Sequence, residues 1–419
     1  MTARLARWSL LILIVFLLAV WLPPLKDSLL GYRAGQTRLF YSPVAETFVY
    51  QEQLGEGHQF SYRDREGNSY PREAFERLLP FIYYKNMELW GELPLTLGGQ
   101  EFDKAAIRAE RLVLQLKPLE LPGHAPRIPL FPLLESDPGR AGLSFPEDVF
   151  NPGDALVFIN SDANQVDTAL SETFSKALAQ QDFQFPVREV FGRVSILKPF
   201  DAGFFLLDSS GQLFHLQRLN AQPQVKAVRL PEDMQVRFIK VTENRHSEVL
   251  GLLLDQAGRL YLMQQDYRLT ALELPGYRAD DMAIKLIFNP LYRTSVYADE
   301  QQIHAQVMDR DYRPLDSYTH RAFAAQTPFL DYVWQALTPF EMQLRDANSR
   351  YLSLQWHWHG WHGLLGISLA LWLGVVWLAR RQRRGQPWDW PSLALLAVSG
   401  LYGALALLLL PPDDRPSAD

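Results

Sequence analysis

The chain has 419 residues, of which 47% are hydrophobic and 21% are charged. These values are close to globular averages and exclude a disordered or collagen-like protein. The net charge is −6 and there is no cysteine, which excludes disulfides, thiolate nucleophiles, Cys-ligated zinc, iron–sulfur clusters and an N-terminal lipoprotein cysteine.

The N-terminus begins with an apolar segment. Residues 8–22 (WSLLILIVFLLAVWL) carry no charge, and counting from Leu5 to Leu25 gives a stretch long enough to cross a hydrocarbon core of about 30 Å. Arg4 and Arg7 would also suit a cleaved signal peptide, but the expected small-x-small cleavage site is missing. We therefore expect an uncleaved transmembrane anchor over residues 1–25, with a signal peptide as the alternative.

The C-terminal part of the chain is also apolar and predicts two further transmembrane helices, over 361–379 and 392–410. Arg380, Arg381, Arg383 and Arg384 lie between them. The positive-inside rule places this loop in the cytoplasm together with the N-terminus, and the acidic tail 411–419 outside. The sequence thus predicts a membrane protein with three transmembrane helices in the bacterial inner (cytoplasmic) membrane, its N-terminus cytoplasmic and its large domain periplasmic.

The large region between the first two spans is acidic. Residues 8–379 contain 34 Lys or Arg and 43 Asp or Glu side chains, a net charge of −9. An acidic domain repels nucleic acid and anionic lipid, which argues against either as its ligand. We expect protein partners and no nucleic acid.

A repeat occurs in the middle of the chain. Residues 203–216 (GFFLLDSSGQLFHL) and 251–262 (GLLLDQAGRLYL) share an apolar strand followed by Asp-x-x-Gly, and 296–307 is a weaker third copy. The repeat turns hold Asp208 with Gly211, Asp255 with Gly258, and Asp299. A period of about 45 residues with several strands is typical of propeller blades or a related repeated sheet.

The fold class expected is therefore a membrane protein with an α+β ectodomain, a β-rich, propeller-blade-like repeat region and a C-terminal helical stalk. A full propeller interrupted by insertions is the alternative. Arg72 to Tyr84, Asp103 to Glu110 and Asp167 to Gln181 read as helical, and Leu112 to Leu116 as a strand. The domains expected are the anchor 1–25, an α+β region 26–184, the β-repeat region 185–322, the stalk 323–360, the second span 361–379, an arginine-rich loop 380–391, the third span 392–410 and the tail 411–419.

The stalk is predicted from a helix-start signal. Thr338-Pro339-Phe340-Glu341 has the form of a capping box with proline at the first helical position. One helix could then run from Pro339 to Ala379, with Gly360 and Gly363 weakening it. Two helices hinged near Gly360 are the alternative.

Chemistry-bearing residues gather at 356–362 (WHWHGWH). His357, His359 and His362 could hold a transition metal or a haem, because imidazole is a common ligand. The competing interpretation is an interfacial aromatic belt in which tryptophan rings lie at headgroup level. Since no carboxylate or cysteine lies beside them in sequence to complete a site, the belt is favoured and no cofactor is predicted.

Other motifs do not indicate a reaction. The turn aspartates could bind a cation or a partner, but turn capping alone explains them. The sequence has no Gly-x-Ser-x-Gly elbow, His-Glu-x-x-His, phosphate-binding Gly-Lys-Ser/Thr loop or Rossmann fingerprint. No catalytic residue is predicted. An envelope hydrolase with a dispersed site has no motif in its favour.

Several segments resemble an uncharacterised bacterial membrane-protein family, known as a domain of unknown function. They are Lys198 to Asp208 (KPFDAGFFLLD), Leu213 to Leu216 (LFHL), Leu337 to Glu341 (LTPFE) and Tyr351 to His357 (YLSLQWH). The resemblance implies a membrane-anchored protein often associated with ABC-type transport systems, and it implies no catalytic residues.

These observations lead us to expect a non-enzymatic inner-membrane protein with a periplasmic binding or scaffold domain. Its partner would be a transporter permease or another envelope protein. The alternative is a metal- or haem-handling membrane protein that uses the juxtamembrane His/Trp cluster.

Overall fold

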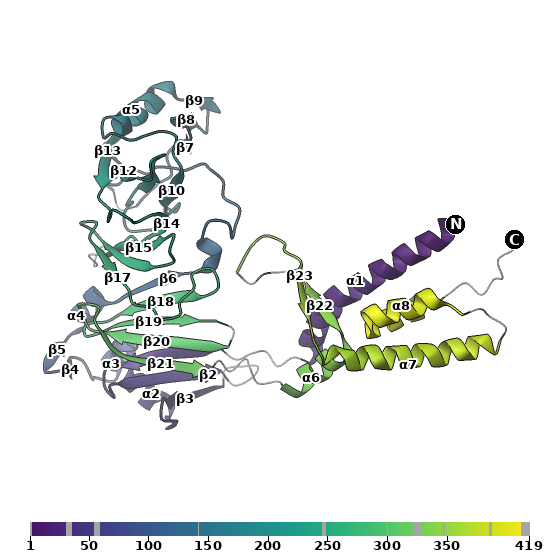
Figure 1. Ribbon diagram of the computed structural model, residues 1–419. Coiled ribbons are helices and arrows are strands. Elements are labelled where there is room, and N and C mark those ends of the chain that lie inside the picture. Colours follow the sequence, from purple (N-terminus) through teal and green to yellow (C-terminus); the bar gives the residue numbers. More distant parts are fainter. Residues whose placement is uncertain are drawn as a thin grey trace. The chain divides into compact units, whose positions relative to one another are not determined.

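The computed structural model describes residues 2–30, 36–53, 59–140, 142–244, 249–299, 301–321, 328–344, 346, 348–384 and 388–411. The chain divides into two compact units (Figure 1). Unit 1 comprises Met1–Gln36, Gln53–Gln59 and Phe323–Asp419, and unit 2 comprises Thr37–Glu52 and Phe60–Ala322. Unit 1 is mainly helical and unit 2 is mainly built of antiparallel sheets.

Unit 2 begins with a three-stranded sheet in the order β1-β2-β3. Its strands are β1 (Thr37–Ser42), β2 (Thr47–Gln53) and β3 (Phe60–Asp64). Short elements follow: α2 (Arg72–Leu78), α3 (Tyr84–Leu89), β4 (Leu95–Leu97), β5 (Gln100–Phe102) and α4 (Lys104–Glu110). The helix expected over 103–110 is confirmed as α4, whereas the helix expected over 72–84 is confirmed only at 72–78, as α2.

A five-stranded sheet in the order β21-β20-β19-β18-β6 joins strands far apart in sequence. The strands are β6 (Leu112–Leu116), β18 (Ala283–Phe288), β19 (Arg293–Ala298), β20 (Gln302–Met308) and β21 (Pro314–Arg321). The strand expected at 112–116 is confirmed, and it pairs antiparallel with β18. A short 3₁₀ helix, η1 (Pro118–Glu120), follows it.

Two four-stranded antiparallel meanders contain the sequence repeats. One has β10 (Glu189–Gly192), β11 (Phe204–Leu207), β12 (Leu213–Leu219) and β13 (Gln222–Val228). The other has β14 (Val236–Val241), β15 (Val249–Asp255), β16 (Leu260–Gln264) and β17 (Leu269–Ala271).

A small α+β layer completes unit 2. It contains β7 (Asp148–Pro152), β8 (Leu156–Asn160), β9 (Gln165–Val166) and α5 (Thr168–Ala179). The helix expected from Asp167 is confirmed, because the Asp167 side chain accepts a hydrogen bond from the Leu170 amide and caps the first turn.

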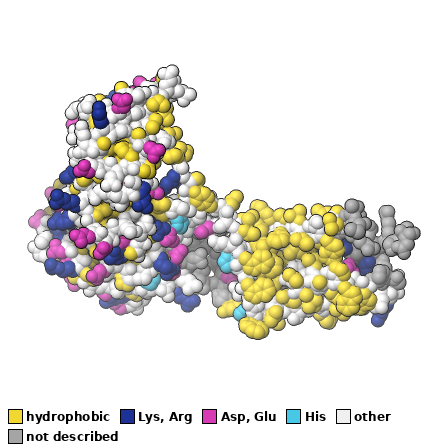
Figure 2. Space-filling model, turned by 45° about the horizontal axis from the view of Figure 1, so that its top comes forward, with side chains coloured by type: hydrophobic (Ala, Val, Ile, Leu, Met, Phe, Trp, Pro, Cys, Tyr) yellow, Lys and Arg dark blue, Asp and Glu magenta, His cyan; other side chains and the backbone are white. Residues whose placement is uncertain are grey.

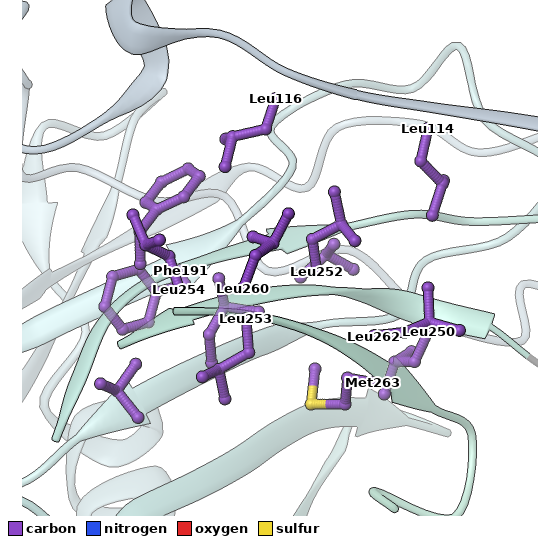
Figure 3. Packing of buried hydrophobic residues seen from close by; sticks show 14 of the residues in the cluster. Leu114, Leu116, Phe191, Leu250, Leu252, Leu253, Leu254, Leu260, Leu262 and Met263 are labelled. Carbon is purple, nitrogen blue, oxygen red and sulfur yellow. The ribbon is translucent and has the colours of Figure 1, made fainter. Parts of the chain in front are cut away.

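The sheets of unit 2 are stacked face to face, and the propeller expectation is wrong. One core lies between the five-stranded sheet and the two meanders, and Figure 3 shows Leu252, Leu254 and Leu260 packing in it. Alternate residues of β11, Phe204 and Leu206, point instead into a second core with β8 and α5. A third core joins β1 and β2 to β20.

There is a physical reason why the stack of sheets does not close into a ring. The β7–β9 layer with α5 covers the outer face of one meander, and the β1–β3 sheet covers the five-stranded sheet at the other end. Both terminal faces are therefore already buried, and ring closure is not needed to bury them. The described residues form neither a closed barrel nor a propeller.

Unit 1 contains two long helices, α1 (Thr2–Leu30) and α7 (Gly363–Gln382). Shorter elements accompany them: α6 (Pro328–Leu337), β22 (Phe340–Gln343), β23 (Gln355–Trp358), α8 (Trp390–Ser399) and α9 (Leu401–Leu409). Helices α1, α7, α8 and α9 pack around Leu11, Ala370, Leu396 and Tyr402.

The helical stalk is the second expectation that is wrong. Helix α6 ends at Leu337, and the Thr338-Pro339 segment leads into the antiparallel hairpin β22–β23. Phe340 and Met342 are buried while Glu341 and Gln343 are less so, which is the period of a strand. The burial of these two alternate side chains outweighs the capping-box signal.

The expectation of a third transmembrane helix over 392–410 is also wrong. The apolar run 392–410 forms α8 and α9, which are 10 and 9 residues long and separated at Gly400. Gly400 has φ 54° and ψ −127°, a conformation that only glycine adopts without strain. Helix α9 turns back, since Leu407 and Leu408 line the same groove as Trp377 and Arg380 of α7. The tail 412–419 lies outside the described residues.

Candidate functional site

Unit 1 carries an extended apolar surface (Figure 2). Helices α1 and α7 are long and apolar enough to cross a membrane, and they are the two described helices of at least 18 residues with this property. Only 17% of the most apolar part of α1 and 28% of that of α7 are buried, so most of their apolar side chains face outward. A surface of this kind is typical of contact with lipid or with another protein. A signal sequence would have the same composition as α1.

Basic residues lie at one end of this apolar unit. Arg380 and Arg381 are in the last turn of α7, and Arg383 and Arg384 follow it. The Arg381 guanidinium lies 5.1 Å from the centre of the Trp377 ring. Arg7 of α1 reaches Asp389, the N-cap of α8, with a nitrogen–oxygen distance of 4.0 Å. The arginines predicted from sequence to mark topology therefore gather at the same end of unit 1 as the start of α1.

The predicted tryptophan–histidine cluster lies on the β22–β23 hairpin and the turn before α7. Trp356 stacks on Phe340 with ring centres 4.3 Å apart, and its exposed fraction is 52%. Trp358 and Trp361 are also exposed. Amphipathic rings of this kind favour the interface between water and lipid.

The three histidines have different environments. His357 is exposed on β23 opposite Glu341. The His359 Nδ1 atom lies 2.8 Å from the Thr338 carbonyl oxygen, and its Nε2 atom lies 3.7 Å from a Glu341 carboxylate oxygen. His362 is exposed at the start of α7. In the described part of the chain, no three His, Cys, Asp or Glu side chains are placed to hold a metal ion.

The turn aspartates lie at equivalent hairpins, and their carboxylates are occupied by the protein itself. Asp208 follows β11 and accepts hydrogen bonds from the Ser210, Gln212 and Gln184 amides. Asp255 is the last residue of β15 and accepts from Arg259. Asp299 follows β19 and accepts hydrogen bonds from the Gln301 and Gln302 amides.

The glycines of these turns have the conformation expected of them. Gly211 has φ 91° and Gly258 has φ 81°, values that favour glycine over any residue with a side chain. The aspartate oxygens bind the amides around this glycine turn. These are structural turns, in which the carboxylate accepts the hydrogen bonds that the backbone amides would otherwise donate to water.

A buried polar cluster in unit 2 was not predicted from sequence. Lys198 Nζ donates to a carboxylate oxygen of Asp201 and, at 2.6 Å, to one of Glu243. It also donates to the Arg193 carbonyl oxygen at 2.8 Å. Burial raises the pKa of both Asp201 and Glu243, and the bonds to Lys198 oppose that rise. The cluster ties the segment between β10 and β11 to the end of β14.

His215 lies next to this cluster. Its Nε2 atom lies 2.5 Å from the Ala202 carbonyl oxygen and its Nδ1 atom lies 2.8 Å from the Tyr267 hydroxyl. Burial lowers the pKa of His215 to about 4, so the ring is neutral at pH 7, with Nε2–H donating to the carbonyl and Nδ1 accepting from Tyr267. The ring stacks on Phe205 with centres 4.4 Å apart.

Both groups belong to segments that carry the sequence resemblance, KPFDAG and LFHL. A lysine three residues before an aspartate in an apolar segment was the available signal. Its partner Glu243 is 45 residues away, and nothing in the local sequence predicts that distance. Because the side chains of the three charged residues are at most 1% exposed, the cluster contributes to packing between sheets and does not present a reactive group to solvent.

Comparison with known proteins identifies the family. Residues 38–308 match the family model described as a domain of unknown function, DUF4857. The match covers more than half of the chain, and the chain belongs to this family. The match begins in β1 and ends in β20, so that it falls in unit 2 except for residues 53–59.

Two other comparisons add no functional information. No curated protein matches the chain. Among solved structures, the chain is similar to PorZ, an essential bacterial surface component of the type-IX secretion system of Porphyromonas gingivalis. The identity is 12%, the TM-score is 0.22, and the match covers 68% of this chain and 29% of PorZ. A TM-score this low supports no conclusion about fold or function.

Proposed function

We propose that this protein is a non-enzymatic component of the bacterial inner membrane whose unit 2 acts as a periplasmic binding or scaffold domain. The observation that carries the proposal is the outward-facing apolar surface of α1 and α7 in unit 1. Burying such a surface in lipid removes it from water at a gain of about 25 cal/mol per Å².

The orientation follows from charge. Arg7 and the arginines at the end of α7 lie at one end of unit 1, and the exposed tryptophans of 356–361 lie before the other end of α7. Under the positive-inside rule the arginine end is cytoplasmic. The N-terminus is then cytoplasmic and unit 2, which the chain forms between α1 and α6, is periplasmic.

The scaffold role is supported by the chemistry of unit 2. In its buried cluster Lys198 bonds a carboxylate oxygen of Asp201 and one of Glu243, and the turn aspartates accept hydrogen bonds from nearby backbone amides. A pocket beside Phe40 and Ile82 encloses about 10 Å³, room for a single water molecule. A domain with internally bonded polar groups and a pocket of this small size is suited to binding a partner protein through its outer surface. The sequence resemblance makes the permease of an ABC-type transport system the first partner class to test.

Membrane location and partner binding are tested one after the other in a single experiment. The tagged full chain is expressed in its native host, membranes are washed with alkaline carbonate, and the retained protein is purified in mild detergent for mass spectrometry. We expect the chain to stay in the membrane and to recover a permease or another envelope protein at comparable stoichiometry. A chain released by carbonate would contradict the membrane location, and a retained chain recovered alone would contradict the scaffold role.

Two exposed apolar residues on loops of unit 2 provide the first surface variants. Ile128 is 75% exposed and Leu197 is 83% exposed. Each of the variants Ile128→Asp and Leu197→Asp should lower recovery of a partner that binds unit 2 at the substituted position. Lys285→Asp, on the exposed side of β18, is the matched control for a new surface carboxylate.

A further inference from the structure

An apolar groove runs between α7, α8 and α9 of unit 1. Its volume is about 370 Å³, within the usual range of roughly 300–1,000 Å³ for ligand pockets. The groove is lined by the apolar side chains of Leu373, Val376, Trp377, Leu407 and Leu408, and by Arg380. It therefore combines an apolar channel with a single cationic group.

The groove results from the bend at Gly400. Helix α8 packs closely on α7, because a Cβ at Gly374 would lie 2.3 Å from a Leu396 methyl carbon. The chain then reverses, and α9 returns with only 9 residues. Small side chains at Ala370 and Ala404 line the space between the helices.

The arginine end of the groove is basic. Arg380 is exposed, and Arg381, Arg383 and Arg384 lie beside it in sequence. The acidic residue described at this end, Asp389, binds the Ser392 hydroxyl at 2.6 Å and faces Arg7. Its charge is thus shared with groups other than Arg380.

We propose that this groove binds one acyl chain of an anionic phospholipid, with the phosphate at Arg380. The inference rests on the proposed membrane location of unit 1. A guanidinium offers paired N–H donors to a phosphate, and basic pockets between membrane helices are suited to anionic headgroups. A partner helix is about 10 Å across and would enter such a groove with its side chains alone, whereas an extended acyl chain can lie along it.

The test uses the full chain, stripped of lipid in detergent and titrated with phosphatidylglycerol or phosphatidylcholine of the same acyl chains, with bound lipid counted by native mass spectrometry. We expect one tightly bound phosphatidylglycerol and about fivefold weaker binding of phosphatidylcholine, since one arginine near a headgroup contributes about that factor. Glycerophosphate without acyl chains should not compete.

Matched variants separate the two parts of the site. Arg380→Gln should remove the preference for phosphatidylglycerol, whereas Arg384→Gln, outside the groove, should keep it. Ala404→Trp should fill the groove and abolish binding of both lipids, whereas Leu409→Trp, on an exposed position of the same helix, should not.

The inference is overturned if Arg380→Gln and Arg384→Gln behave alike, or if Ala404→Trp, still folded by circular dichroism, binds lipid as the wild type does. Failure of the membrane location is recognised separately, because the chain would then be released by carbonate. A chain that stays in the membrane but binds no lipid contradicts only the groove.

Discussion

Lys198 holds two carboxylates together inside unit 2. The side chains of Lys198 and Glu243 are fully buried and that of Asp201 is 1% exposed. Moving three charges out of water is costly, and the cluster is favourable only while every partner is present. Lys198 therefore fixes how the β10–β13 sheet packs against the β14–β17 sheet.

Lys198→Met should therefore leave two buried carboxylates without the ammonium that bonds both of them, and the remaining cation, Arg193, lies 3.8 Å from Glu243. We expect a loss of about 3–5 kcal/mol in the free energy of unfolding of unit 2. Urea unfolding of the full chain in detergent, followed by hydrogen exchange in peptides of β11 and β14, measures it. Lys285→Met, an exposed lysine on β18, is the control and should change little. Equal losses in the two variants would contradict a special role for Lys198.

His215 predicts a pH dependence. Its pKa is about 4 in the folded protein and near 6.5 when unfolded. The folded state favours the neutral ring, so the stability that it contributes is full above pH 6.5 and is lost as the pH falls toward 4. The shift corresponds to about 3 kcal/mol.

His215→Gln should remove this component. We expect the variant to lose less stability than the wild type between pH 6.5 and pH 4, whatever its stability at pH 7. Asp201 and Glu243, whose raised pKa values act in the opposite direction, are present in both proteins and cancel in the difference. Parallel pH profiles of the two proteins by urea unfolding would contradict the assignment.

At the scale of elements, the hairpin turns differ in how much their aspartates contribute. Asp208 is buried and receives three backbone amides, whereas Asp299 receives two at a less buried turn. Asp208→Ala should lower the stability of unit 2 by about 1–3 kcal/mol, because buried amides lose their acceptor. Asp299→Ala should cost less than Asp208→Ala. Thermal unfolding by circular dichroism compares them, and the reverse order would contradict this argument.

Local patterns predict helical segments of unit 2, the strand 112–116 and the repeat hairpins, but not β1 to β5 or β7 to β9. The Asp-x-x-Gly repeats identify the hairpins because turn chemistry is local. The stacking of sheets was not predictable, because β6 pairs with β18, which lies about 170 residues later in the chain. A repeat period shows that sheets recur and does not show whether their ends meet.

In unit 1 the errors have different causes. The capping-box motif at Thr338 has the right residues for a helix, but Phe340 and Met342 are buried as a strand. The run 392–410 has the composition of a membrane span, but Gly400 takes a conformation that breaks it. The histidines lie close in sequence, yet the strand and turn that hold them give each a different neighbour.

At the scale of the whole molecule, the absence of cysteine makes topology directly measurable. Single substitutions Ser209→Cys, Arg384→Cys and Pro411→Cys add the first thiol at three informative positions. In cells with a permeabilised outer membrane, a charged maleimide should label Ser209→Cys alone. Arg384→Cys and Pro411→Cys should react only after the inner membrane is disrupted, because α9 returns toward the arginine end.

Labelling of Pro411→Cys together with Ser209→Cys would contradict the reversal of α8 and α9. Labelling of all three positions at once would contradict the orientation as a whole. Ser209 is exposed at the β11–β12 turn, so a lack of reaction there could not result from burial.

The places where the chain joins unit 2 lie close together on that unit. Thr37 is paired with Glu52 across β1 and β2, and the Glu52 carboxylate lies 3.1 Å from His320 of the last strand. In unit 1, Lys26 of α1 and Asp331 of α6 form an ion pair at 2.9 Å. Apart from the short segment 53–59, which belongs to unit 1, unit 2 is thus an insertion whose first and last strands are close, in a host whose flanking helices also meet. Such an arrangement allows a gene to acquire, exchange or lose the whole inserted module while the host remains foldable.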